Sequence, residues 1–430
     1  MASALRAGSR TTDTGRITFY VALAVFAQES TWNFYDNRVP ELLRDHVASA
    51  AVIGLIMGMD NLLGIFIQPY MGNRSDNTRT SWGRRIPYLA VMMPLGAALF
   101  LLIPLMTSLA WLILVIFLYA LVMNSFRPIS ESLMPDFIEP ERRSRANAAV
   151  KIASGLTVIV AALISLLLVD DHPKLAFAVP SALMLVAAAV LVWRVRDSRS
   201  PAYRSALVED AAAAAGAPRH TPAKIKMRTV IGDLVLDRDR SRLLLIAAVF
   251  VFGCAWFASR SLMTPYGVTV LGLSDGEAGG LTLPSGVAFL LAAFPAALLA
   301  ERFGRPRIMA VGMTVFCAGT LLGAAVQTPA GTVVAMCLAA AGAAGFVINA
   351  VVVLWNLAPS SRVLGAYSGL YTVGWAGGGI GGPALVGLAV DFTGWHLMFL
   401  HLAALTVVAI LLVLRIHRRL RASSAREHAA

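Results

Sequence analysis

Long runs of apolar residues recur along the whole length of this sequence. They are centred near residues 28, 60, 96, 122, 158 and 184, and again near 255, 289, 316, 344, 377 and 404. A helix needs about 20 mostly apolar residues to cross a bilayer. The runs are continuous and do not alternate with a period of two, which excludes a β-barrel. We therefore predict an all-α membrane protein of twelve transmembrane helices.

The composition agrees with membrane embedding. Hydrophobic residues make up 58% of the chain and charged residues only 14%, which is too little charge for a water-exposed surface. The net charge of +12 lies mostly in short segments between the apolar runs. This distribution indicates membrane topology and argues against a nucleic-acid partner.

The runs fall into two sets of six, which predicts two pseudo-symmetric halves. We assign residues 1–193 to an N-terminal six-helix bundle, 194–241 to a mobile cytoplasmic linker, and 242–430 to a C-terminal bundle with a cytoplasmic tail. The linker prediction depends on its Arg and Lys residues, an Ala tract and three prolines.

Local features also repeat between the halves. Gly83-Arg84-Arg85 has a counterpart in Gly304-Arg305-Pro306-Arg307. We expect the core of the first helix to end around Pro40 and that of the seventh around Pro265. Such repeats place a substrate path between the halves, near the bilayer midplane. The alternative is coincidence of two prolines and two Gly-Arg loops.

The basic residues set the orientation, because cytoplasmic loops are enriched in Lys and Arg. With both termini inside, the inner loops contain Arg74, Arg79, Arg84, Arg85, Arg142, Arg143, Arg145, the linker cluster, Arg302, Arg305, Arg307 and the group from Arg415 to Arg426. No small-residue cleavage site follows the first run, so we expect it to remain as a helix and not to act as a signal peptide. We predict a multi-pass protein of the plasma (inner) membrane with cytoplasmic termini.

The most specific motif follows the second run. It reads Gln68-Pro69-Tyr70-Met71-Gly72-Asn73-Arg74-Ser75-Asp76, then residues 77–82 and Gly83-Arg84-Arg85. We expect Gly72 to permit a tight exit from the helix. Asp76 can accept from the N-terminus of an adjacent helix or pair with a basic residue across the interface of the halves. A basic loop that only fixes topology is the simpler interpretation.

This segment resembles the loop signature of the major facilitator superfamily, which implies that fold. Residues 77–88, Asn-Thr-Arg-Thr-Ser-Trp-Gly-Arg-Arg-Ile-Pro-Tyr, look like the loop of the glycoside-pentoside-hexuronide cation symporters. Gln68-Pro69 looks most like their sucrose:proton branch, and Asp136 with Arg143 to Asn147 fits the same family. The resemblance implies a gating role for the residues Gly72, Asp76, Gly83, Arg84, Arg85, Asp136 and Arg145.

One departure bears on ion coupling. The melibiose permease branch has paired acidic residues on the second helix for sodium, whereas here Gln68 stands at the second position and only Asp60 remains. Proton coupling is therefore the better hypothesis.

Ionisable residues within the apolar runs need a reason to be there, since each costs roughly 2.5–3.5 kcal/mol at a helix centre. The set comprises Glu29, Asp36, Asp60, Arg127, Glu131 and Arg260. Asp60 lies about twelve residues, roughly 18 Å, from the outer start of its helix. We predict that Asp60 carries the coupled proton, with Glu29 second. A structural Asp that caps a broken helix or pairs with an Arg is the alternative.

The first run has two polar stripes at helical spacing. Glu29, Asn33 and Asp36 form one, and Gln28, Trp32 and Tyr35 form the other. Aromatic rings beside amides and carboxylates suit a sugar, whose C–H faces stack on rings while its hydroxyls form hydrogen bonds. An interfacial aromatic belt would also explain the rings.

Further candidate substrate residues lie on other runs. Arg127 could bind substrate oxygen, or it could simply neutralise Glu131 at i+4. Arg260 is a comparable feature of the second half, with snorkelling as its alternative. Asn349 and Asn356 share a helix face, and glycines from 374 to 382 favour either a moving gate or tight packing.

No phosphate-binding loop, His-rich metal spacing or nucleophile elbow is found, so we expect no enzyme activity, metal or cofactor. Cys254, Cys317 and Cys337 are expected to be packing residues. We predict a monomeric proton-coupled symporter of a small polar solute, a sugar or glycoside. The alternatives are a proton-driven exporter of amphipathic compounds, a lipid or glycolipid flippase, and a membrane-bound enzyme or receptor.

Overall fold

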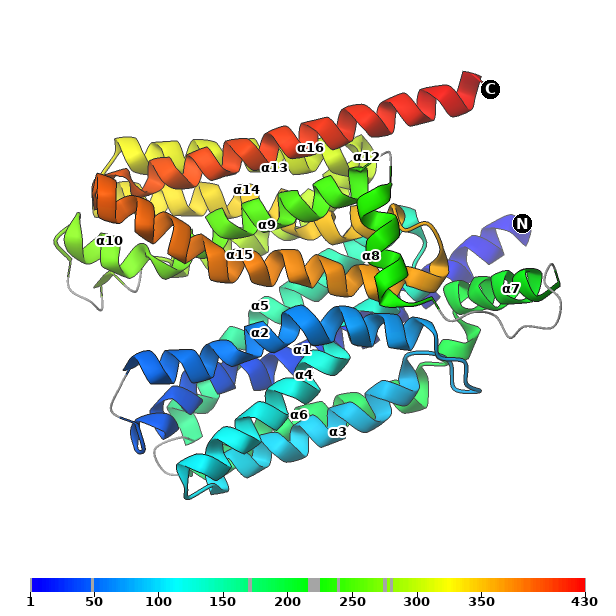
Figure 1. Cartoon of the computed structure of the whole chain (residues 1–430), viewed down its shortest axis with the longest axis horizontal. Helices are drawn as coiled ribbons and strands as arrows, with labels where there is room; N and C mark the ends of the chain where they lie inside the picture. Colours follow the sequence, from blue (N-terminus) through cyan, green and yellow to red (C-terminus); the bar gives the residue numbers. More distant parts are fainter. Residues whose placement is uncertain are drawn as a thin grey trace. The chain divides into compact units, whose positions relative to one another are not determined.

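A computed structural model describes residues 2–47, 50–168, 172–215, 225–237, 240–273, 277–278 and 281–429. This part of the chain is all-helical, and twelve long helices lie at the twelve apolar runs (Figure 1). The predicted fold class is confirmed. The long helices are α1 (Ala2–Arg44), α2 (Ala50–Asp76), α3 (Ile86–Leu102), α4 (Leu109–Phe137), α5 (Arg143–Leu168), α6 (Pro173–Arg194), α9 (Ser241–Ser261), α12 (Leu283–Phe303), α13 (Arg305–Ala325), α14 (Pro329–Asn356), α15 (Leu364–Thr393) and α16 (Met398–Ala429).

Within the described residues, nine helical segments are long and apolar enough to cross a membrane. They correspond to α3, α4, α6, α9 and α12 to α16. The three remaining long helices, α1, α2 and α5, complete the two sets of six.

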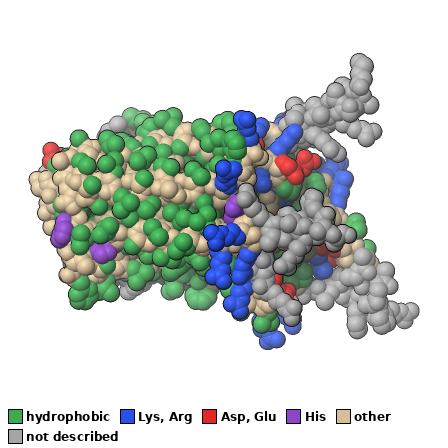
Figure 2. All heavy atoms as spheres, turned by 90° about the horizontal axis from the view of Figure 1, so that it is seen from above, with side chains coloured by type: hydrophobic (Ala, Val, Ile, Leu, Met, Phe, Trp, Pro, Cys, Tyr) green, Lys and Arg blue, Asp and Glu red, His purple; other side chains and the backbone are tan. Residues whose placement is uncertain are grey.

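The surface is consistent with contact to lipid. Large apolar side chains such as Phe66, Leu291 and Phe392 are exposed on the long helices. Exposed apolar area of this extent is unfavourable in water but not in a hydrocarbon environment. On the face drawn in Figure 2, hydrophobic side chains run along the helices and Lys and Arg side chains gather toward one end.

The chain divides into two compact units. Unit 1 comprises Met1–Val230 and Ala358–Gly369, and unit 2 comprises Ile231–Leu357 and Leu370–Ala430. The first residues of α15 therefore belong with the N-terminal helices, although they come from the second half of the sequence.

Each unit has its own aromatic core. In unit 1, Phe34, Phe100 and Phe177 pack edge to face or tilted, with ring centroids 5.0–6.3 Å apart. In unit 2, Phe252 contacts Phe316 at 5.1 Å and Phe346 at 4.6 Å. All three cysteines are free thiols, and two of them, in α9 and α13, are buried.

The segment predicted to be a mobile linker contains two helices in its described part, α7 (Pro201–Ala215) and α8 (Met227–Leu236). α7 packs against α4 and against η4 (Ser361–Val363), a 3₁₀ turn that precedes α15. These two helices were not expected, because the polar composition and the prolines of the segment suggested a linker.

The predicted helix ends near two prolines need refinement. The repeat of Pro40 and Pro265 suggested similar helix ends in the two halves, but α1 continues through Pro40 to Arg44. In the second half, α9 ends at Ser261, and Pro265 lies in the following short helix α10 (Met263–Thr269).

Candidate functional site

Unit 1 has a charged group within its long helices. An oxygen of Glu29 on α1 lies 3.1 Å from the Arg127 guanidinium on α4, and Glu131 on the same helix lies 3.7 Å from that guanidinium. The side chains are 18%, 27% and 17% exposed, respectively. Arg127 thus bridges two carboxylates, and all three retain access to their surroundings.

Neutral polar groups lie beside these charges. Ser130 donates to Oε1 of Gln28 at 3.4 Å. Gln28 is buried, and its Nε2 has no hydrogen-bond partner within the described residues. A buried donor without a partner is unusual in folded proteins and suits an incoming acceptor. We refer to Gln28, Glu29, Arg127, Ser130 and Glu131 as the α1–α4 polar group.

The second predicted stripe of α1 is part of an aromatic cluster. The Tyr35 ring stacks on Tyr119 of α4 at 5.3 Å, and Trp32 lies 6.0 Å from the same ring. Tyr35 and Tyr119 are buried, whereas Trp32 is half-buried. Sequence reasoning missed Tyr119, since a single Tyr in an apolar run is unremarkable.

Asn33 connects α1 to α5, donating to the hydroxyl of Thr157 at 2.7 Å and to the Glu29 carbonyl at 3.0 Å. These two hydrogen bonds give Asn33 a structural role. Asp36, the third member of that stripe, is exposed.

Asp60 is buried on α2. Its carboxylate accepts from the backbone N–H of Asn61 at 2.6 Å and from the Asn61 side chain at 3.0 Å. Both donors are neutral. The Asn124 amide donates to the Asp60 carbonyl, and Gln68 donates to the Asn124 oxygen at 2.7 Å. Gln68 thus links α2 to α4, a contact that its sequence position did not reveal.

The predicted residues of the second half lie in unit 2. The Arg260 guanidinium stacks over the Trp256 ring at 4.8 Å. Asn349 is buried and donates to the Gly345 carbonyl at 2.9 Å, while its Oδ1 has no partner among the described residues. Asn356 is exposed, so the two asparagines differ in environment.

At one end of unit 1, four charged residues are completely buried. Arg84 binds Asp136 through Nη2 at 2.7 Å and Nε at 3.0 Å. Arg85 binds the same carboxylate through Nε at 2.9 Å and binds Asp76 at 2.6 Å. Pairs of this kind stabilise only when every charge is compensated, as it is here.

Asp76 also binds the start of α15. Its two carboxylate oxygens accept from the backbone N–H groups of Gly365 at 3.0 Å and Ala366 at 2.9 Å. The N-terminus of a helix has unpaired N–H groups and favours a negative charge. A helix N-terminus is thus bound to Asp76, as predicted. The basic partner, Arg85, comes from the same half of the sequence and not from the other half, as was expected.

Gly72 does not provide the predicted exit from the helix, since α2 continues to Asp76. A Cβ at Gly72 would lie 2.1 Å from the Gly365 carbonyl oxygen. The glycine therefore permits close approach of α2 to the start of α15. We name one set of residues the buried ion cluster. It comprises Asp76, Arg84, Arg85, Asp136 and Asp197, the last of which is described next.

Asp197 follows α6 and belongs to the segment predicted as a linker. It accepts hydrogen bonds from the backbone N–H groups of Arg84 and Arg85. Burial raises the pKa of Asp197, with a further contribution from the charge of Asp136. Burial disfavours the Arg85 cation, but the carboxylates of Asp136 and Asp76 outweigh it and raise the pKa of Arg85.

α7 adds two more acidic contacts to this end of unit 1. Asp210 pairs with Arg79 at 2.7 Å and with Arg362 at 3.0 Å. Glu209 accepts from the hydroxyls of Ser360 and Ser361. Sequence reasoning missed both acids, because a lone Glu-Asp pair beside an Ala tract indicates no partner. Arg145, a predicted gating residue, is exposed at the start of α5.

Comparison with known proteins supports the membrane assignment. A family model described as Major Facilitator Superfamily matches residues 17–293 and 271–429. A "Membrane-associated transporter protein" of Mus musculus is 34% identical over 91 residues, which cover 20% of this chain and 17% of that protein. The protein of the same name from Homo sapiens is 32% identical over 83 residues, covering 19% and 16%. The chain thus matches less than a fifth of the length of either relative.

Solved structures share the fold across nearly the whole chain. The Escherichia coli fucose:proton symporter FucP has a TM-score of 0.74 at 17% identity, with 92% of this chain and 97% of that chain covered. A bacterial homologue of the iron transporter ferroportin has a TM-score of 0.74 at 14% identity, with 94% and 99% covered. The human organic anion transporter MFSD10 has a TM-score of 0.72 at 15% identity, with 93% and 99% covered.

Proposed function

This chain belongs to the Major Facilitator Superfamily of membrane transporters, and we propose that it is a proton-coupled symporter of a small polar solute, a sugar or glycoside. In this proposal it works as a monomer in the plasma (inner) membrane, with both termini in the cytoplasm. The two halves alternate access to a central site, as repeated halves do in secondary transporters.

The α1–α4 polar group supports a polar solute. Charged side chains within membrane helices are costly and mark substrate or ion pathways. Glu29 and Arg127 form an ion pair but stay partly exposed, so a solute hydroxyl can reach either partner. The free Nε2 of Gln28 offers a further donor. A pair of charges beside an unused amide is the observation that carries the proposal.

The adjacent aromatic cluster supports a sugar in particular. Trp32 is half-buried and backed by the stacked rings of Tyr35 and Tyr119. A ring held in this way can stack on the C–H face of a sugar, while directional hydrogen bonds select the hydroxyls. In unit 2, Asn349, with its buried Oδ1, is a second candidate contact.

Asp60 is the proposed proton carrier. It is buried, and its carboxylate is held by neutral donors from Asn61. Protonation would therefore not require breaking an ion pair at that carboxylate. Glu29 is the second candidate, since it is already paired with Arg127. A fucose:proton symporter is among the proteins of the same fold, so the fold can accommodate this coupling.

The decisive experiment measures uptake and counterflow of labelled sugars in proteoliposomes, with and without a pH gradient. We expect the parent to accumulate a sugar only with the gradient. Asp60→Asn should keep counterflow and lose accumulation. Asp391→Asn, which alters an exposed carboxylate near the end of α15, is the matched control and should behave as the parent does.

Two outcomes would contradict the proposal separately. If no sugar or glycoside exchanges, the substrate class is wrong. If Asp60→Asn still accumulates the sugar with the gradient, the assignment of Asp60 is wrong, and Glu29→Gln becomes the next variant to test.

A further inference from the structure

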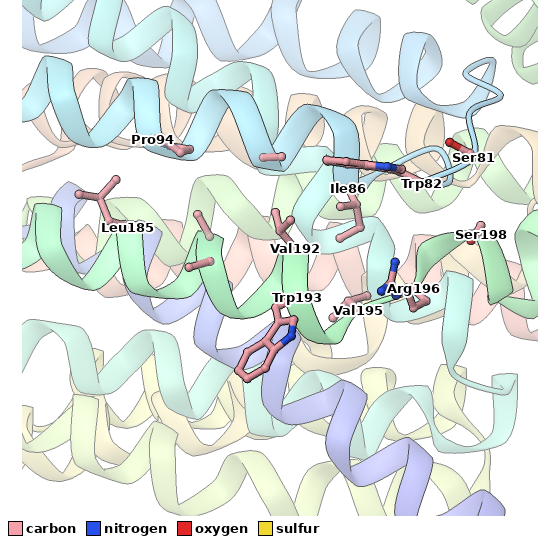
Figure 3. Close-up of a pocket in the computed structure, with 13 residues that line it drawn as sticks. Ser81, Trp82, Ile86, Pro94, Leu185, Val192, Trp193, Val195, Arg196 and Ser198 are labelled. Carbon is pink, nitrogen blue, oxygen red and sulfur yellow. The ribbon is translucent and has the colours of Figure 1, made fainter.

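A groove of about 570 Å³ lies in unit 1 between α3 and α6. Its walls come from four short stretches: the end of the segment before α3, α3 itself, α6, and the residues that follow α6 (Figure 3). Along the helices the lining is apolar and includes Pro94, Leu185 and Val192. Toward the helix ends it becomes polar, with Ser81, Arg196 and Ser198.

The change from apolar to polar lining coincides with two tryptophans. Trp82 lines the groove before α3 and is 55% exposed, and Trp193 lines it near the end of α6 and is 71% exposed. Exposed tryptophans in membrane proteins concentrate at the level of the lipid headgroups. The groove therefore extends from the headgroup level into the hydrocarbon region.

Charge at the polar end favours an anion. Arg194, Arg196 and Arg199 follow one another along the exposed segment, with Arg196 in the groove lining. The one acid among them, Asp197, is buried, and its carboxylate is turned to the backbone of Arg84 and Arg85. The exposed charges of this segment are thus all positive.

The groove also adjoins the buried ion cluster. Arg196 and Ser198 flank Asp197, while Ser81 and Trp82 precede Gly83 and Arg84. Gly83 has a φ of 106°, and a Cβ there would lie 2.4 Å from the Asp197 carboxylate. Asp197 contacts the segment Gly83–Arg85. Residues that line the groove are therefore direct chain neighbours of both partners in this contact.

We propose that this groove binds one phospholipid with an anionic headgroup, whose phosphate pairs with Arg196 and whose acyl chain lies along α3 and α6. The bound lipid stabilises the packing of residues 81–86 against residues 195–198. It thereby stabilises the positions of Arg84 and Arg85 in the buried ion cluster. The inference is independent of the transported solute.

Native mass spectrometry of the purified full chain tests the binding, with phosphatidylglycerol and phosphatidylcholine titrated separately. One Arg–headgroup interaction predicts about fivefold tighter binding of phosphatidylglycerol. Arg196→Gln should abolish this preference. Arg302→Gln removes an exposed arginine of α12 that neither lines the groove nor belongs to the segment from Arg194 to Arg199, so it should retain the preference.

A second variant tests the acyl chain. Ala189 is exposed and lines the groove, so Ala189→Phe fills the apolar part without changing any charge. It should weaken binding of both lipids. Hydrogen exchange should show slower exchange of residues 81–86 in the parent when phosphatidylglycerol is added, and no such change in Arg196→Gln.

Several results would overturn the proposal. Equal binding of the two lipids by the parent excludes a headgroup site, as does an unchanged preference in Arg196→Gln. Undiminished binding by Ala189→Phe excludes the acyl-chain position. Unchanged exchange of residues 81–86 in the parent excludes the link to the buried ion cluster.

Discussion

Unit 1 contains two groups of charges that differ in how completely they are enclosed. In the buried ion cluster, Arg84 and Arg85 are fully buried and each makes several short bonds to carboxylates. In the α1–α4 polar group, Arg127 contacts carboxylates at 3.1 Å and 3.7 Å and remains 27% exposed. The cluster also binds backbone N–H groups, whereas the polar group makes longer contacts and stays partly exposed. We infer that the buried ion cluster serves closure of the transport pathway and that the α1–α4 polar group serves binding of the solute.

The largest expected effect tests the enclosed group. Asp136→Asn removes the carboxylate that both Arg84 and Arg85 bind. Breaking a buried ion pair leaves a charge without compensation, so we expect a loss of about 3–5 kcal/mol of unfolding free energy. Equilibrium unfolding in mixed micelles measures this value. A loss below about 1 kcal/mol would show that the cluster relaxes around the substitution and is not rigid.

The next effect concerns the close approach of α2 to α15. Gly72→Ala would place a Cβ against the Gly365 carbonyl, and overpacking of this kind costs about 1–3 kcal/mol. Gly387→Ala is the matched control in α15, since a Cβ added there would meet no atom within 4 Å. The control should be neutral or stabilising by up to about 1 kcal/mol. Equal effects of the two variants in the same unfolding assay would refute the packing argument.

Asp197 allows a finer test of the cluster. Asp197→Ala leaves the N–H groups of Arg84 and Arg85 without their acceptor, which we expect to cost about 1–3 kcal/mol. Asp197→Asn keeps an acceptor oxygen and should cost less than the alanine variant. If both variants unfold alike, the carboxylate charge matters more than the hydrogen bonds. Hydrogen exchange at the two amides gives the local readout.

The smallest effect on stability is expected in the α1–α4 polar group. Glu29→Gln should change the unfolding free energy by less than about 1 kcal/mol, because partly exposed ion pairs contribute little. Loss of a charged contact to solute should nevertheless raise the solute concentration for half-maximal uptake by about tenfold or more. Glu131→Gln, with the longer contact, should change uptake less. A large loss of stability in Glu29→Gln would mean that this pair is structural.

Sequence reasoning succeeded where the physical signal is local. The apolar runs predicted the twelve helices, because each span must satisfy its length and hydrophobicity separately. A helix N-terminus at Asp76 was also anticipated, since a carboxylate near a loop has few options for compensation, whereas its basic partner was expected from the other half and is Arg85 of unit 1. That the helix N-terminus involved would be that of α15 could not be derived, because Gly365 lies far along the chain.

The failures concern residues whose role depends on distant partners. The prediction for Gly72 followed from its position near a helix end, whereas its close contact comes from α15. Glu209 and Asp210 lie in a segment whose Ala and Pro content suggested a linker, so nothing local indicated contacts to Ser360 or Arg362. Tyr119 and Asn124 were missed because one polar residue in an apolar run is uninformative without its neighbours.

The segment Ala358–Gly369 comes late in the sequence yet is part of unit 1, where Asp76 receives the first N–H groups of α15. Suppose that the chain were expressed as two separate polypeptides, divided within the stretch between α7 and α8. The C-terminal polypeptide would still contain the segment that binds to the N-terminal one. This twelve-residue segment would then give the two fragments a contact that needs no covalent tether. Gene fragments coexpressed in this way would complement each other, and fragments with Asp76→Ala would do so poorly.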